Sequence, residues 1–486
     1  MILNKAMYDK TMHSIFNQAS NDNKLQNQSI AFNHSDTLNN FYKNTISSLS
    51  DDWRFYTTSI KVFKAFVKMS MKKGNIKNDR GTKITAALNT IEEEIRLGKI
   101  NLFSMNCTSI HHCIQELLKN KVGNVAFDLF IGYSSYEHKA TVTRIWMRDA
   151  TDALSIAIDG LQSALLAKAE NHIKNVIPSY IDHQVSQPIS IAYHFIGYIQ
   201  MLKRDKERML DMRKRVNVLP IGSYLGAGSN FNISRKTIAR ELDFAHVGQH
   251  SMDNLISKDF LIEFASTISI CATNISRLIN NLIKWQEHSV DFIHLSKESL
   301  GPDHFSQEAR FPKILGYIKS KVSSICAANA NITTQLQEAE YQISHNLDSI
   351  EHIALSVYQD LFHILSITSA LVDALSINKK KAKDKSHSIE GMAPDILGWL
   401  LQNTNLHYKS ALNATKAIIT KSKTESIKPS LIDIEDLQKI EPQITNDIYS
   451  VLIPLRCVVS RRNEGGSTPV IIKKMIKQFR KELHSV

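Results

Sequence analysis

The chain contains little glycine, proline or cysteine for its length. Its 486 residues include 17 glycines, 10 prolines and 5 cysteines. Low glycine and proline contents disfavour turn-rich sheet proteins and favour long uninterrupted helices. The cysteines are scattered and odd in number, and none forms a Cys-x-x-Cys pair. We therefore expect reduced thiols and exclude a disulfide-stapled fold.

Long apolar runs are also missing. The longest candidate lies near residues 260–285, where Glu263 and Arg277 leave only a short uncharged stretch. Because a membrane-spanning helix needs roughly 20 apolar residues, we predict none. The first 40 residues are polar and rich in asparagine, without the apolar segment of a secretory signal. These features predict a cytoplasmic protein that has no membrane partner.

The sequence lacks the common signatures of nucleotide and metal sites. It contains no glycine-rich phosphate loop, no His-Glu-x-x-His motif and no internal repeat. His111 and His112 are adjacent, but neighbouring residues on a helix point to different faces and no third ligand is suitably spaced. We therefore predict no metal and no cofactor.

The net charge of +12 is open to two interpretations. A basic chain often binds nucleic acid or acidic substrates, but lysines spread over solvated helix faces give the same total. No basic stretch alternates with aromatic residues, as expected in a protein that binds single strands. The densest run, at residues 379–383, follows a helical segment and is interpreted as a helix end or an exposed loop. We therefore do not predict nucleic acid as a partner.

Apolar residues recur with helical spacing through most of the chain. Several helical segments exceed 25 residues, and a wide apolar stripe on such a long helix must be buried on more than one side. We therefore predict a helical bundle that also packs against other subunits. The predicted helical segments are residues 84–97, 110–118, 141–177, 189–216, 235–242, 255–285, 315–338 and 347–377.

Proline and glycine positions suggest how these segments are grouped. Breaks occur at Pro178, Pro188, Gly222 and Gly301. We predict four parts, namely a variable N-terminal segment at residues 1–40, an N-terminal helical domain at 41–140, a central long-helix bundle at 141–378 and a C-terminal helical domain at 379–486.

Six segments, in the same order and at similar spacing, resemble motifs of the argininosuccinate lyase family within the fumarase/aspartase superfamily. Residues 178–188 resemble its Gly-Tyr-Thr-His-x-Gln-x-Ala-Gln-Pro motif, and residues 109–123 resemble its acidic-Ile-His segment. The resemblance covers about residues 45–480. The other matching segments are the glycine-rich turn at 220–228, the Ser-x-Asp helix start at 251–259, Ser276-Arg277, and the C-terminal segments 447–449 and 465–469.

This resemblance implies an all-α, fumarase/aspartase-like fold with three helical domains. The central long-helix bundle of such proteins contributes to a core of about 20 helices in a homotetramer. Segments from three subunits meet at each site in the family, so the resemblance also implies that the chain's main partner is itself. A small-molecule ligand is the second implied partner.

The family's chemistry is the elimination of an amine or water from a succinyl group, which releases fumarate. A serine on a loop acts as the base beside a carboxylate, and a Thr-His pair supports the acid side. Lysine and asparagine on the same loop hold the carboxylates and the negatively charged intermediate. The resemblance thus implies general base catalysis combined with electrostatic stabilisation.

This chain departs from the family at those positions. The catalytic loop of the family reads Gly-Ser-Ser-x-Met-Pro-x-Lys-x-Asn-Pro, and Arg310 is the one cation left in the matching stretch. The Thr-His pair is replaced by Ile181-Asp182, with His183 one residue later. In the loop, Asp303 and His304 replace the serines, Ala309 replaces the lysine and Phe311 replaces the asparagine.

The matched positions give two sets of candidate site residues. The candidate catalytic residues are Asp303, His304, Asp182 and His183. The candidate substrate-binding residues are His111, Ser134, Tyr136, Gln187, Arg310 and Lys258.

Two functions remain open at this point. The site is either rebuilt, with the four candidate catalytic residues meeting between subunits as a carboxylate–imidazole set, or kept only for binding or assembly. A rebuilt site would act on an N-succinyl or amino-acid-derived substrate, and Tyr133, Tyr136 and Phe311 favour a less anionic one. In both cases we predict that cleavage of argininosuccinate to fumarate and arginine is not the activity.

Overall fold

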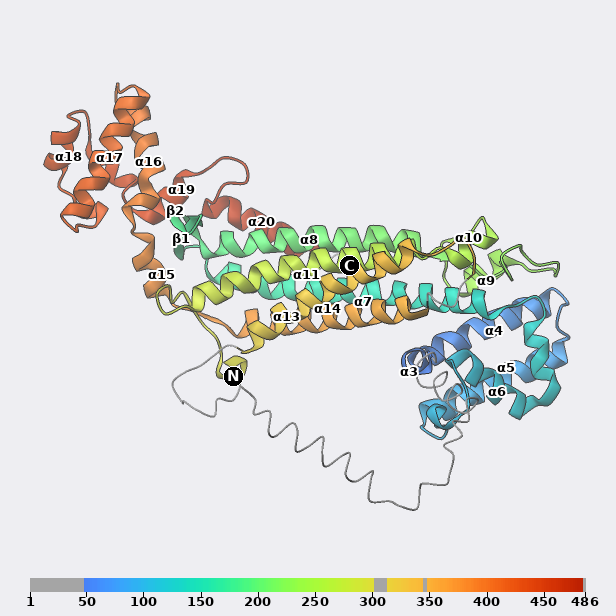
Figure 1. Ribbon diagram of the computed structural model, residues 1–486. Helices are drawn as coiled ribbons and strands as arrows, with labels where there is room; N and C mark the ends of the chain where they lie inside the picture. Colours follow the sequence, from blue (N-terminus) through green and yellow to red (C-terminus); the bar gives the residue numbers. More distant parts are fainter. Residues whose placement is uncertain (1–47, 301–312, 344–347, 484–486) are drawn as a thin grey trace, which may run out of the picture.

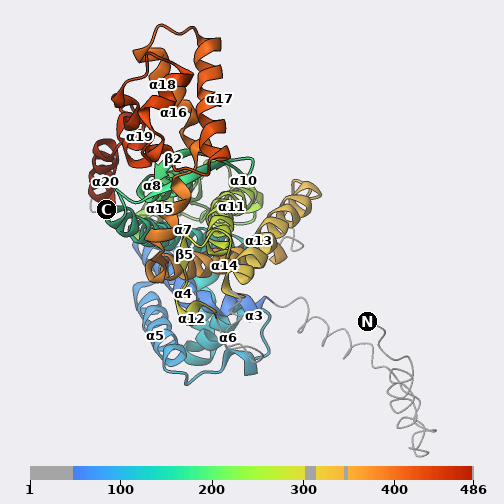
Figure 2. The ribbon, with the colours of Figure 1, turned by 90° about the vertical axis from the view of Figure 1, so that its left-hand side faces the viewer.

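The computed structural model describes residues 48–300, 313–343 and 348–483. A bundle of long helices runs through the middle, with one helical body at each end (Figure 1). The predicted mostly helical architecture with a long-helix bundle is therefore confirmed. The bundle consists of α7 (Ser135–Asn171), α8 (Ile191–Val216), α11 (Asp259–Gln286), α13 (Lys313–Gln337) and α14 (Asp348–Ala374), which pack side by side (Figures 1 and 2).

Apolar residues at helical spacing form the core of the bundle. On α7, Leu154, Ile158, Leu161 and Leu165 lie on one face and are fully buried. Helix α20 (Pro469–Leu483) joins this core and packs against α7 and α8 (Figure 1). Residues 469–483 thus return to the bundle after the C-terminal body.

The N-terminal body has a separate hydrophobic core. Its helices are α3 (Leu49–Asp52), α4 (Tyr56–Lys72), α5 (Asn78–Arg96) and α6 (Ile110–Val122). The segment after α8 returns to this body and adds Leu219, Ile238 and Phe244 to its core. That segment contains α9 (Arg235–Glu241) and the parallel pair of β3 (Val218–Leu219) with β4 (His246–Val247), and α10 (Ser251–Ile256) follows it.

The C-terminal body forms the third hydrophobic core. Helix α16, with Trp399 and Leu400 in this core, packs against α17. The short antiparallel pair of β5 with β6 connects this end of the bundle to the C-terminal body. The elements are β5 (Ile293–His294), α12 (Lys297–Leu300), β6 (Ser376–Ile377), α15 (Lys379–Ser386), α16 (Ile389–Asn403), α17 (Tyr408–Thr424), α18 (Ile434–Ile440) and α19 (Pro454–Ser460).

The bounds predicted for the first long helix were wrong at both ends. Helix α7 begins at Ser135, six residues before the predicted start, because Ser134 and Glu137 form a capping box. It ends at Asn171, where the predicted continuation to residue 177 gives way to a turn and then to an antiparallel hairpin that begins at Val176. The hairpin strands are β1 (Val176–Ile181) and β2 (Gln184–Ser190).

Two other predicted helices also differ from the structure. The segment 255–285 is split into α10 and α11 by a break at Ser257-Lys258. The segment 347–377 ends as a helix at Ala374, and β6 follows. The four-part division of the chain stays a prediction.

Helix α14 is apolar for most of its length. Among the described residues, one stretch, Ile350–Ala374, is long and apolar enough to span a membrane, and 44% of its most apolar window is buried inside the structure. Core helices of soluble proteins meet the same criterion, so the stretch is weak evidence for a membrane span.

Candidate functional site

A cavity of about 300 Å³ lies where the bundle meets the N-terminal body. Residues from α6, α7, α10 and α14 form its walls, and α3 contributes from the side of the N-terminal body. Its titratable lining residues are Asp52, His111, Tyr136, His138, Lys139, Lys258 and Glu351.

The start of α7 is fixed by a buried carboxylate. Glu137 is fully buried, and its Oε2 accepts hydrogen bonds from the backbone N–H groups of Gly222 (2.9 Å) and Tyr224 (2.7 Å). Burial raises the pKa of Glu137 to about 7, while these hydrogen bonds oppose the rise. Ser134 donates its hydroxyl to the Tyr224 carbonyl (2.6 Å). Tyr136, in the first turn of α7, lines the cavity, whereas the candidate residue Ser134 does not.

An ion cluster occupies one side of the cavity. The Glu351 carboxylate lies 2.5 Å from Lys258 Nζ and 3.7 Å from Lys139 Nζ. Burial opposes ionisation of Glu351, but the two lysines outweigh it and lower the pKa of the carboxyl group. Both lysines of the cavity are therefore already partnered by a carboxylate of the chain itself.

A second carboxylate stands nearby. Asp52 Oδ1 accepts the backbone N–H of Ile110 (3.0 Å), and Oδ2 accepts the hydroxyl of Ser48 (2.7 Å). Burial raises the pKa of Asp52 to about 6, partly offset by these hydrogen bonds and by Lys139. At pH 7 Asp52 thus adds negative charge to the cavity.

Two histidines line the cavity beside the carboxylates, and of these His138 is buried and His111 is half-buried. His138 lies between Tyr133 and Ser59, and its Nε2 is 2.6 Å from the serine Oγ. Its ring centroid is 4.4 Å from that of His111. Burial lowers the pKa of both imidazoles, that of His111 to about 3, so both are neutral at pH 7. Nδ1 of His111 is buried without a hydrogen-bond partner among the described residues.

The structure brings together only some of the candidate residues. His111, Tyr136 and Lys258 line the cavity, whereas Gln187 lies on β2 at the other end of the bundle (Figure 1). Asp182 and His183 form the tip of that hairpin and are exposed. Three further candidates, Asp303, His304 and Arg310, lie outside the described residues.

Sequence reasoning missed Asp52, Lys139 and Glu351. Each stands in or near a first helical turn, where a charged residue usually interacts with the helix dipole or solvent. Only the packing of α14 against α7 and α11 brings Glu351 to Lys139 and Lys258, and the N-terminal body places Asp52 in the same cavity. Asp348 and Glu351 both stand at the start of the apolar α14, and nothing in the sequence distinguishes Glu351 as the one that faces a cavity.

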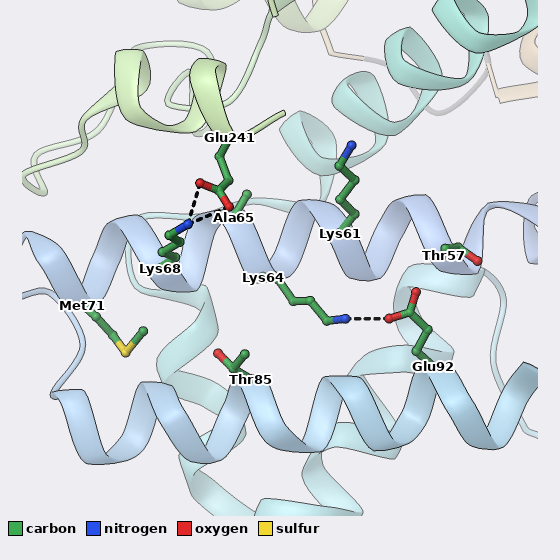
Figure 3. A pocket seen from close by; sticks show the side chains of 9 residues that line it. All are labelled: Thr57, Lys61, Lys64, Ala65, Lys68, Met71, Thr85, Glu92 and Glu241. Carbon is green, nitrogen blue, oxygen red and sulfur yellow. Dashed lines mark hydrogen bonds and ion pairs between the residues drawn. The ribbon is translucent and has the colours of Figure 1, made fainter. Parts of the chain in front are cut away.

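A second hollow, of about 530 Å³, lies between α4, α5 and α9 in the N-terminal body (Figure 3). Lys64 is paired with Glu92 (2.5 Å), and Lys68 with Glu241 (2.7 Å). None of the candidate residues lines it. Within the described parts of the chain, no group of three or more His, Cys, Asp or Glu residues is placed to hold a metal ion.

Comparison with known proteins assigns the family. The sequence model described as Lyase matches residues 33–300, more than half of the chain. The chain therefore belongs to this lyase family.

Its curated relatives include argininosuccinate lyases. The chain is 29% identical to argininosuccinate lyase of Ehrlichia ruminantium (strain Welgevonden) over 442 residues, which cover 91% of this chain and 96% of the relative. It is 28% identical to argininosuccinate lyase 1 of Mesorhizobium japonicum over 437 residues, covering 90% and 94%. The resemblance to argininosuccinate lyases predicted from the sequence motifs is confirmed.

Solved structures support the same fold. EDDS lyase in complex with formate superimposes with a TM-score of 0.76 at 20% identity, covering 88% of this chain and 86% of that one. Class II fumarase from Schistosoma mansoni gives a TM-score of 0.68 at 12% identity, covering 82% and 90%. The predicted fumarase/aspartase-like fold is therefore confirmed.

Proposed function

We propose that this chain is a divergent argininosuccinate-lyase-like protein that does not catalyse the standard cleavage of argininosuccinate. The observation that carries the proposal is the pairing of Glu351 with Lys258 and Lys139. The succinyl group of argininosuccinate has two carboxylates, which need cationic or hydrogen-bonding partners when they leave water. In this cavity a carboxylate of the chain itself, that of Glu351, already pairs with the two lysines.

The charge balance of the cavity supports a less anionic ligand. Above the Asp52 pKa of about 6, two carboxylates offset the charges of Lys139 and Lys258. The remaining walls include the apolar side chains of Phe55 and Leu255. A neutral or zwitterionic small molecule with an apolar or aromatic part suits such a cavity better than a dianion.

Altered lyase chemistry is the second candidate function. This chemistry uses an acid–base set that acts on an N-succinyl or amino-acid-derived substrate. The set consists of Asp182, His183, Asp303 and His304. The observation that favours it is the strained backbone of Asp182 and His183, since such strain is typical of functional sites. In the alternative, the scaffold binds a ligand or assembles without catalysis.

In both candidate functions, the chain assembles with three other copies of itself into a homotetramer in the cytoplasm. Large apolar side chains are exposed on the central helices, where the bundle would pack against other copies. These residues are Ile156 on α7, Leu210 on α8, Ile270 on α11 and Phe362 on α14.

The first experiment incubates the purified chain with argininosuccinate and follows the ultraviolet absorbance of fumarate. An authentic argininosuccinate lyase is the positive control. We expect no fumarate above the enzyme-free blank. Turnover comparable to the control would refute the proposal.

The second experiment tests the electrostatic argument with Glu351→Gln. Removing this charge takes away the carboxylate that pairs with Lys258 and Lys139, so succinate is expected to raise the melting temperature of the variant and not that of the wild type. Glu92→Gln is the matched control, because it breaks an equally short Lys–Glu pair outside the cavity. A Glu351→Gln variant that gains no succinate response would contradict the role of this carboxylate.

A further inference from the structure

A buried hydrogen-bond network of three side chains reaches the cavity. His138, in the first turn of α7, meets the Tyr133 hydroxyl at Nδ1 and the Ser59 hydroxyl at Nε2, where the nitrogen–oxygen distance is 2.6 Å. All three residues are buried, and Ser59 and His138 line the cavity. Phe63 of α4 stacks on the imidazole, with ring centroids 4.3 Å apart. In such apolar surroundings each hydrogen-bonding group needs a partner.

The direction of these hydrogen bonds follows from the Tyr133 hydroxyl. Burial raises the pKa of Tyr133 well above its usual value, so the phenol keeps its proton. Among the described residues, His138 is its one hydrogen-bond partner. If Tyr133 accepted from Nδ1, its own buried hydrogen would have no acceptor, which is costly. Tyr133 therefore donates to Nδ1, and the neutral imidazole carries its hydrogen on Nε2.

This direction leaves the hydrogen of the Ser59 hydroxyl free. Nε2–H of His138 donates to Ser59 Oγ, so the serine accepts one hydrogen bond and keeps its own hydrogen for another. Within the part of the chain that the structure describes, the Ser59 hydroxyl has no second hydrogen-bond partner. Because Ser59 lines the cavity, we expect an oxygen of a bound ligand to accept this hydrogen.

The surroundings of the Ser59 hydroxyl favour an uncharged acceptor. Burial lowers the pKa of His138 well below its usual value, so the ring beside the hydroxyl carries no charge at pH 7. Lys139 and Lys258 are already paired with Glu351. A carboxylate at Ser59 would therefore leave water without a cationic partner, whereas the carbonyl oxygen of an amide needs only a hydrogen-bond donor.

We propose that Tyr133 and His138 are positioning residues that make the Ser59 hydroxyl an uncharged donor in the cavity, and that the ligand presents a neutral amide carbonyl oxygen to it. The tyrosine acts through the imidazole, and Ser59 is the member of the network that touches this oxygen. The inference rests on the proposed function in that a small, weakly anionic molecule fills the cavity. It adds the chemical class of the group that is bound there.

The direction of the network is tested by nitrogen NMR of the full chain labelled with ¹⁵N-histidine at pH 7. His138→Gln assigns the resonances, and Ser59→Ala, which removes the partner of Nε2, gives a second assignment if the first variant does not fold. We expect an unprotonated Nδ1 and a protonated Nε2 in the wild type. Tyr133→Phe should give a mixture of the two tautomers, because neither then satisfies Nδ1. A protonated Nδ1 in the wild type, or an unchanged pattern in Tyr133→Phe, would overturn the positioning role.

The donor role is tested by titrating the chain with benzamide and, separately, with benzoate. The two probes share a ring and differ in the charge of the carbonyl group, and ligand-observed NMR gives both affinities. We expect benzamide to bind more tightly than benzoate. Ser59→Ala should weaken benzamide binding about 3- to 10-fold, which corresponds to one hydrogen bond between neutral groups. Ser59→Thr, which keeps the hydroxyl, should restore most of this loss.

Ser70→Ala is the matched control, because Ser70 is an equally buried serine of α4 that does not line the cavity. It should leave benzamide binding unchanged. The donor role would be overturned by equal affinities for benzamide and benzoate, by no binding of benzamide, or by equal affinities of wild type and Ser59→Ala. Fumarate release from argininosuccinate is measured in a separate assay, so a failure of this inference is distinguishable from a failure of the proposed function.

Discussion

Asp52 illustrates how one buried carboxyl group links the cavity to pH. Burial raises its folded-state pKa from 3.8 to about 6, against the hydrogen bonds from Ser48 and Ile110. Between these pH values the folded chain keeps a proton that the unfolded chain has released. Stability from this group is therefore complete below about pH 4 and is lost as pH rises through about 6.

Asp52→Asn is expected to remove this pH dependence, since the amide does not titrate. The difference in free energy of unfolding between wild type and variant should change by at most about 3 kcal/mol from pH 4 to pH 7. Urea unfolding at a series of pH values measures it. Asp79→Asn, at an exposed position of α5, should leave the wild-type profile unchanged. If the free energy of unfolding of Asp52→Asn changed with pH in parallel with that of the wild type, burial would not raise the pKa of Asp52.

At the scale of elements, the N-terminus of α7 organises the glycine-rich turn beside the cavity. Tyr224 has a φ of 52°, which is costly for a residue with a side chain. Glu137 offsets that cost by accepting two N–H groups of the turn. This turn also contacts α10, through a hydrogen bond from the Asn254 amide to the Ser223 hydroxyl (3.0 Å).

Glu137→Gln is expected to destabilise the chain by about 2 kcal/mol. The two N–H groups of the turn share Oε2 of Glu137, and Oε1 accepts the backbone N–H of Ser134. The glutamine amide has a single acceptor oxygen, so a buried N–H group on one side or the other loses its partner. Thermal and urea unfolding measure the loss, with the exposed Glu207→Gln on α8 as control. Equal stability of the two variants would mean that the turn does not depend on this carboxylate.

A substitution in the hairpin turn is predicted to increase the stability of the chain. His183→Gly is expected to stabilise the chain by about 0.5–1 kcal/mol, because relief of left-handed strain exceeds the extra entropy of glycine in the unfolded state. Gln184→Gly, one residue later and within β2, should destabilise instead. Urea unfolding distinguishes these outcomes, and a loss of stability in His183→Gly would indicate that the turn is not strained.

Helical periodicity was enough to predict the long helices, because their apolar faces repeat over many turns. It failed at α7, where the local Ser134–Glu137 capping box decides the start. It also failed at residues 176–177 and 189–190, which belong to the hairpin strands, and the hairpin itself was not predicted because Asp-His is not a usual hairpin turn. The ion cluster was beyond reach, since Lys139 and Glu351 are distant in sequence and only packing brings them together.

At the scale of the whole molecule, the cavity and the hairpin are separated by the length of α7. Its 37 residues correspond to about 55 Å. Tyr136 stands in its first turn, and the hairpin follows its last. Within one copy, the hairpin tip is therefore far from the cavity.

Light scattering is expected to give the mass of a tetramer for the wild type. Ile156→Glu should shift the population towards smaller species, because this side chain is 69% exposed on the bundle and would meet another copy there. Leu431→Glu, at a residue 67% exposed in the C-terminal body, is the control and should leave the mass unchanged. A wild-type monomer would contradict any site shared between copies.

The continuous α7 also limits how the chain can change in length. One inserted residue in the middle of a helix turns everything beyond it by about 100° and advances it by about 1.5 Å. Tyr136 and the hairpin are attached to opposite ends of the same helix, so such an insertion would rotate one relative to the other. Viable insertions in α7 are therefore expected in steps of about seven residues, which preserve the buried face. The distance between the cavity and the hairpin can therefore change only in whole steps of about two helical turns.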